Sequence, residues 1–126
     1  MGEAWSWHAA DQSFPLNQVA AQFGYTINKD VVYEADPVSE HPVTHEVSRI
    51  QIVGGSSISG KGGSHIAIAP DRRPVLVAGH YGDGRFVIIG DSDIFVSIDY
   101  DADGIPVIYE YDNERLATNT FKWLSN

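Results

Sequence analysis

The chain has 126 residues, no cysteine and a formal net charge of −9 at pH 7. The acidic balance argues against nucleic acid or an anionic lipid surface as the main partner, because both are bound by clustered Lys and Arg. The lack of cysteine excludes disulfides, thiolate metal sites and a cysteine nucleophile. No apolar run approaches the roughly 20 residues that span a bilayer, so direct membrane insertion is not expected.

The first predicted element is a helix that begins near Pro15 and ends before Gly24. Its apolar residues have the i, i+3, i+4, i+7 spacing of one buried helical face; they are Leu16, Val19, Ala20 and Phe23. Proline near the start and glycine just past the end are the usual punctuation of a helix. Short extended pieces follow at 25–27 and 31–33, and a β-rich run at 49–53.

The next predicted strands lie on either side of glycine-rich connections. Residues 54–64 are rich in Gly and Ser and predict a flexible connection. Residues 65–69 alternate with period two, which predicts a strand with one buried face. Residues 74–78 and 85–90 predict two more strands, and the glycines between them predict a hairpin whose loop is longer than two residues.

A closing amphipathic helix is predicted after an acidic segment. Its apolar stripe consists of Leu116, Ala117, Thr120, Phe121 and Leu124. Asp112 or Asn113 is the predicted N-cap, because short polar side chains accept hydrogen bonds from the first free N–H groups of a helix. We expect one domain over residues 1–126, with no internal repeat.

Several motifs of the C-terminal part recur together in a known family. They comprise Tyr81, Gly82, Gly84, Arg85, Gly90, Asp91, Ser92, Asp93, Asp112, Asn113, Arg115, Leu116, Asn119, Trp123 and Leu124. Residues 74–124 thereby resemble the C-terminal half of a class I glutamine-amidotransferase-like domain. They are most similar to the uncharacterised domains of gliding-motility-type ABC-transporter accessory proteins and to trehalose-utilisation-like domains. The resemblance implies an α/β fold, a truncated flavodoxin-like three-layer sandwich with a C-terminal β-hairpin and helix.

The sequence departs from that family in two ways. The opening βα unit is missing, so we expect either a fragment of a larger protein or a sheet completed by another chain, such as a second copy, at an open edge. The Cys-His-Glu triad of true amidotransferases also lacks its cysteine. The resemblance therefore implies the scaffold without that activity, and an extracytoplasmic domain of a surface or transport-associated protein as its context.

An acidic motif precedes the closing helix. Asp99, Asp101, Asp103, Gly104 and Glu110 match the spacing of a calcium-binding loop. Alternating carboxylates converge on a hard cation, glycine permits the sharp turn and the later glutamate completes the shell. The flanking segments predict extended structure rather than helices, so the candidate is a Ca2+ loop outside an EF-hand. The alternative is a solvated acidic turn.

A second candidate site is expected at the end of the strand 85–90. Asp91, Ser92 and Asp93 follow that strand directly, and His80 lies in the predicted hairpin loop. Ligands of open α/β sheets bind at such strand ends. The alternative is that Asp91 and Ser92 hydrogen-bond the turn and the neighbouring helix end.

Together these observations predict a non-catalytic ligand- or protein-binding module, which calcium would stabilise if the acidic loop binds that ion. Its partners would be a protein or a second copy at an open sheet edge. The alternative is a hydrolase-type enzyme with a pocket near Asp91, Asp93 and His80.

Overall fold

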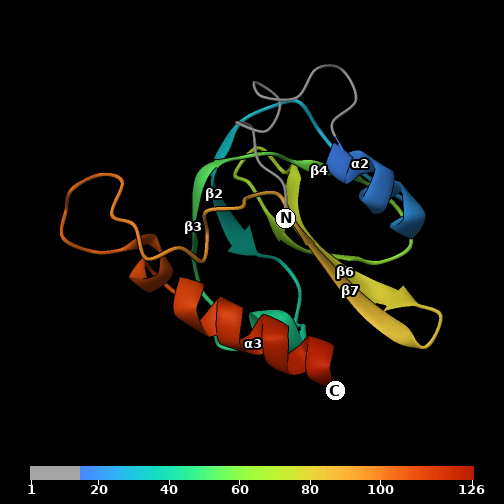
Figure 1. Cartoon of the computed structure of the whole chain (residues 1–126). Coiled ribbons are helices and arrows are strands. Elements are labelled where there is room, and N and C mark those ends of the chain that lie inside the picture. The colour runs from blue at the N-terminus through green and yellow to red at the C-terminus, as the bar shows by residue number, and fades with distance from the viewer. Residues whose placement is uncertain (1–14) are drawn as a thin grey trace.

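The computed structural model describes residues 15–126, which form two antiparallel sheets and a few helical segments (Figure 1). The larger sheet has the strand order β3-β2-β5-β6-β7. These strands are β2 (Val32–Pro37), β3 (Ile50–Gly55), β5 (Ser64–Ile68), β6 (Pro74–Tyr81) and β7 (Gly84–Ile89). The smaller sheet pairs β1 (Tyr25–Ile27) with β4 (Ile58–Gly60).

Two helices lie on opposite sides of β6 and β7 (Figure 1). They are α2 (Pro15–Ala20), continued by the 3-10 turn η1 (Ala21–Phe23), and α3 (Asn113–Ser125). Two further 3-10 turns are η2 (Pro42–Thr44) and η3 (Val107–Tyr109). The predicted first helix is confirmed, and it ends at Gly24, whose φ of 83° is left-handed. None of the described helices is long and apolar enough to cross a membrane.

The strand alternation divides the apolar side chains between two cores. Phe86 and Ile88 of β7 pack with Ala20 and the smaller sheet. Val87 and Ile89 point to the other face, where the larger core includes Leu116 and Trp123 of α3. Each core excludes water from one face of the same sheet, so β6 and β7 hold the two halves of the fold together.

The predicted three-layer α/β sandwich is wrong. Neighbouring strands are antiparallel throughout the described sheets, and the fold is mostly β with two short helices. A parallel pair needs a crossover of a dozen or more residues, usually a helix. Only residues 69–73 join β5 to β6, and only residues 82–83 join β6 to β7, so neither connection has room for one.

Two local expectations also fail. Residues 54–64 are not a continuous flexible connection, because β4 forms within them and pairs with β1. The hairpin between β6 and β7 has a two-residue turn rather than a longer loop, and Gly82 at its first position has φ of 58°. A glycine at that position fits the favoured two-residue hairpin turns.

Candidate functional site

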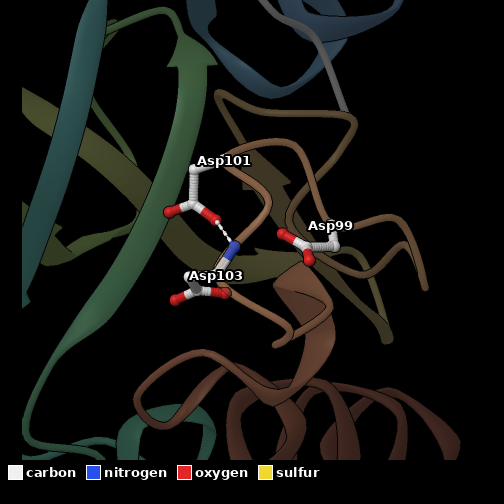
Figure 2. A group of neighbouring side chains, drawn as sticks. All are labelled: Asp99, Asp101 and Asp103. Carbon is white, nitrogen blue, oxygen red and sulfur yellow. Dashed lines mark hydrogen bonds between the residues drawn. The ribbon is translucent and has the colours of Figure 1, made fainter.

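The acidic loop, residues 99–104, projects away from the sheets between β7 and α3 (Figure 1). Asp99, Asp101 and Asp103 each place one carboxylate oxygen within 4.8 Å of those of the other two (Figure 2). Ligand oxygens that share a Ca2+ at about 2.3–2.6 Å are separated by at most about 5 Å. The spacing of the three carboxylates is therefore compatible with one cation.

Backbone hydrogen bonds hold this loop in shape. Gly104 N–H donates to Oδ2 of Asp99 at 2.8 Å, Asp103 N–H to Oδ1 of Asp101 at 3.3 Å, and Ile105 N–H to Oδ1 of Asp103 at 2.7 Å. Ala102 and Gly104 have left-handed φ values of 59° and 92°. These are also the features of a solvated acidic turn.

The carboxylates affect one another's protonation. The Gly104 N–H is the main reason why the pKa of Asp99 is lowered. The Asp103 N–H acts to lower the pKa of Asp101, but desolvation, a hydrogen bond with Asp99 and the charges of Asp103 and Asp99 together raise it. Desolvation, followed by the charges of Asp103 and Asp101, raises the pKa of Glu110. A bound cation would relieve this repulsion.

Glu110 is therefore an electrostatic neighbour of the loop, although the tight group of carboxylates is formed by the three aspartates. The assignment of Asp99, Asp101, Asp103 and Glu110 to a Ca2+ stays a prediction. Asp101 and Glu110 also line an apolar groove of about 470 Å3. Its other lining residues are Val31, Tyr33, Gln51, Ile52, Val53, Gly54, Tyr100, Ile105 and Val107.

The second predicted site is not assembled. His80 pairs with Arg85 near the hairpin turn, whereas Asp91 follows the opposite end of β7. At about 3.3 Å per residue, roughly 20 Å of strand separates them. His80 instead lies edge-on to the ring of Trp123, with centroids 5.8 Å apart, and the Trp123 ring also contacts His41 at 4.9 Å. The three residues of the alternative enzyme pocket therefore do not converge.

Asp91 is fully buried and holds backbone in place. Its Oδ2 accepts a hydrogen bond from Val53 N–H at 2.6 Å, and its Oδ1 accepts one from Asp93 N–H at 2.8 Å. A side chain with 0% exposure cannot contact a ligand at the surface. This arrangement agrees with the turn-bonding alternative, and a ligand role for Ser92 and Asp93 stays a prediction.

The bond from Val53 to Asp91 belongs to a larger pattern along β3, one edge of the main sheet. Outward N–H groups of this strand, and the N–H groups of the two residues before it, are bonded to side chains from the C-terminal part of the chain. Asp112 Oδ2 accepts from Ser48 and Arg49 N–H at 2.8 and 3.1 Å. Asn113 accepts from Gln51 N–H at 3.0 Å and donates to Gln51 C=O at 3.2 Å. The β3 edge is thus closed by side chains.

The opposite edge, β7, has a different environment. Gly90 N–H donates to Val75 C=O at 2.9 Å, and the β6–β7 register then directs the backbone groups of residues 84, 86 and 88 toward β6. Those of Arg85, Val87 and Ile89 point outward. Among residues 15–126, no hydrogen bond reaches this outer side of Arg85 and Val87. We call these outward groups of Arg85 and Val87 the open β7 edge.

An apolar groove of about 300 Å3 runs along the open β7 edge. It is lined by Leu16, Val19, Ala20, Phe23, Ile27, Arg85, Phe86, Val87, Ile88 and Leu124. Val19 and Leu124 are 58% and 39% exposed. The sequence predicted an open sheet edge but did not locate it at β7, because the alternation of residues 85–88 predicts a strand without saying whether that strand has one neighbour or two. The strand order was needed to find it.

Comparisons with known proteins support the fold. No protein-family model and no curated protein matches the sequence. Among solved structures, the chain is similar to one described as "mmIFT52 N-terminal domain", with a TM-score of 0.69 and 17% identity. The match covers 89% of this chain and 58% of that one, so this chain spans a little over half the length of its structural neighbour. At this identity the likeness shows the fold alone.

This neighbour corrects the family resemblance drawn from the sequence. It has a β-rich fold, and it supports neither an amidotransferase-like nor a flavodoxin-like domain. The motifs that suggested the resemblance have structural roles here instead. For example, Asp112 and Asn113 bond β3, while Arg85 donates to the Trp123 C=O at 2.6 Å.

Proposed function

We propose that this domain is a protein-interaction module that binds a segment of a partner protein at the open β7 edge. The observation that supports it is the outer side of Arg85 and Val87, which has no partner among residues 15–126 and lies beside an apolar groove. Unpaired strand edges are templates for pairing with another chain, and folded proteins commonly cover or charge them. The other edge of the same sheet is covered by side chains, so the open edge is specific to β7.

The structural neighbour supports the same class of function. That structure is the N-terminal domain of a larger protein, and its likeness suggests a module for protein–protein contact. A hydrolase has less support, because His80 lies far from Asp91 along the strands and Asp91 is buried among backbone donors. Pairing through β7 needs no convergent titratable groups; it needs free backbone groups and apolar surface.

A selection experiment tests this function. A library of random linear peptides would be selected on the immobilised domain and, in parallel, on the Val87→Pro variant. Proline removes the outward N–H of Val87 and leaves the β6–β7 hydrogen bonds intact. Edge strands tolerate proline at such outward positions. We expect enriched peptides on the wild-type domain that lose binding on the variant. Failure to enrich any peptide, or equal binding of the enriched peptides to both proteins, would contradict the proposal.

A further inference from the structure

From the chemistry along β7, we infer that the bound segment is an extended strand with an acidic residue opposite Arg85 and apolar residues on its face toward α2. This inference rests on the proposed function and specifies the partner at the same site. It concerns a partner protein, because the open β7 edge offers backbone donors and acceptors at strand spacing.

The backbone sets the conformation of the segment. Arg85 and Val87 each present one N–H and one C=O on the outer side, and residues two apart along a strand repeat at about 6.6 Å. Only another extended strand places its own alternate groups at that spacing. Ile89 continues the row but is 3% exposed, so pairing is limited to the half of β7 nearest the hairpin.

The groove sets the apolar face. Residues of an added strand that point to the α2 side would lie beside Phe86 and Ile88, which are 6% and 8% exposed in the absence of a partner. Val19 and Phe23 line the groove on this side, and the Phe23 ring packs on the Phe86 ring with their centroids 4.8 Å apart. β-branched or aromatic residues at alternate positions would pack on these apolar side chains, as cross-strand neighbours do within sheets.

Arg85 sets the charged position. Among residues 15–126, it is the only charged residue that lines the groove. One guanidinium nitrogen donates to the Trp123 C=O at 2.6 Å, and the group lies 5.3 Å from the centroid of the Trp123 ring. Arg85 forms no ion pair among residues 15–126, whereas Arg49, Arg73 and Arg115 each contact a carboxylate. A carboxylate on the partner would accept hydrogen bonds from the remaining N–H groups of this guanidinium.

A second copy of this chain meets these requirements poorly. Residues 84–89 contain Arg85 and no acidic residue, so pairing of β7 with itself supplies no carboxylate within the strand. Two copies would also each carry a net charge of −9, which opposes association. The occupant is therefore a segment of a different protein.

Three synthetic peptides of about ten residues test the inference by fluorescence anisotropy. Val alternates with Thr in each of them, and one central Thr is replaced by Glu, Gln or Lys. We expect the Glu peptide to bind the wild-type domain about 5-fold more tightly than the Gln peptide, as a partly exposed ion pair would give, and the Lys peptide to bind most weakly. Arg85→Gln should remove the preference, Arg85→Lys should restore part of it, and Arg85→Glu should reverse it.

The controls separate the two proposals. Arg115→Gln removes a cation of α3 that is ion-paired with Glu46, and it should leave the order of affinities unchanged. Equal binding of all three peptides, lost on Val87→Pro, would overturn the acidic preference and keep the binding edge. Absence of binding by all three, or binding that Val87→Pro leaves intact, would overturn the proposed function as well. Sedimentation velocity of the wild-type domain adds one further outcome: dimers abolished by Val87→Pro would make a second copy the occupant.

Discussion

The two edge strands of the main sheet, β3 and β7, differ in whether their outward backbone groups are hydrogen-bonded. At β3, the N–H groups of Gln51 and Val53 bond to Asn113 and Asp91, and the N–H of Arg49, just before the strand, bonds to Asp112. At β7, the outward groups of Arg85 and Val87 bond to nothing among residues 15–126. The closed edge stabilises the domain, and the open edge is available to a partner.

The difference follows from where the polar side chains lie. Asp91, Asp112 and Asn113 all belong to the segment after β7, which passes back across the molecule to reach β3. Nothing comparable returns to β7 within the described chain. An edge closed by side chains cannot add a strand without losing those bonds, so binding is expected at β7.

The largest expected effect on stability comes from substitution of Gly90, the residue directly before Asp91. A Cβ on Gly90 would lie 1.8 Å from the backbone oxygen of Ser56, whose N–H donates to Gly90 C=O at 2.6 Å. Gly90→Ala should therefore lower the free energy of unfolding by about 3 kcal/mol or more, because backbone must move. Gly84→Ala, at the other end of β7, meets its nearest atom at an ordinary 3.4 Å and should change stability by less than about 1 kcal/mol. Urea denaturation measures both; equal effects would contradict the packing described.

A matched pair of proline substitutions compares the edges directly. Val53→Pro removes the N–H that Asp91 accepts, leaving a buried carboxylate short of a donor, so we expect a loss of roughly 3 kcal/mol or more. Val87→Pro removes an outward N–H that has no partner within the described chain, and should cost about 1 kcal/mol or less. Thermal melts of both variants test this, since the first loss is a fall in Tm on the order of 10 °C. Similar falls in Tm would show that the edges do not differ.

Two asparagines of α3 give the next comparison. Asn113 is fully buried and bonds the backbone of Gln51, Ile94 and Val107, whereas Asn119 makes a single bond, to His45 C=O at 2.8 Å. Asn113→Leu should cost about 2 kcal/mol, because it leaves buried backbone groups without partners. Asn119→Leu should cost about 1 kcal/mol or less. Chemical denaturation measures the free energy of unfolding of both variants. A larger loss for Asn119→Leu than for Asn113→Leu would exclude the role assigned to Asn113.

The smallest expected effect concerns the acidic loop. The pKa values of Asp101 and Glu110 are raised in the folded state, so their contribution to stability is present at low pH and lost as pH rises through those raised pKa values. The lowered pKa of Asp99 acts in the opposite direction. At pH 7 without calcium, Asp101→Asn should therefore raise Tm slightly.

The same Tm measurement with added calcium tests the predicted metal site. If the predicted site binds Ca2+, the wild-type Tm should rise with added calcium and fall back with EDTA, while Asp101→Asn should remove the response. Asp83→Asn, in the β6–β7 turn, is the control that keeps the loop intact. A wild-type Tm that calcium leaves unchanged would make the loop a solvated turn.

The sequence predicts local structure here better than it predicts topology. The spacing of Leu16, Val19 and Phe23 correctly places the first helix, and the glycine turn correctly joins β6 to β7. Strand direction is not encoded in alternation, so the same segments fitted a parallel α/β sandwich that the antiparallel pairing overturns. The contacts that decide the sheet order are long-range, and single-sequence periodicity does not carry them.

The same limit applies to the sites. Asp112 occupies the predicted N-cap position, but its side chain bonds Ser48 and Arg49, more than 60 residues earlier in the chain. The spacing of the acidic motif did predict that Asp99, Asp101 and Asp103 gather, because they are neighbours in one tight loop. Local motifs can thus be located from the sequence, whereas the open β7 edge emerges only from the strand order.

Amide hydrogen exchange, followed residue by residue by NMR, tests the difference between the edges most directly. The account predicts that the amides of Arg85 and Val87 exchange rapidly, and that those of Gln51 and Val53 are protected by Asn113 and Asp91. Addition of the Glu-containing peptide should then protect Arg85 and Val87 and leave the β3 amides unchanged. Protection of Val87 equal to that of Val53 in the free domain would contradict an open β7 edge.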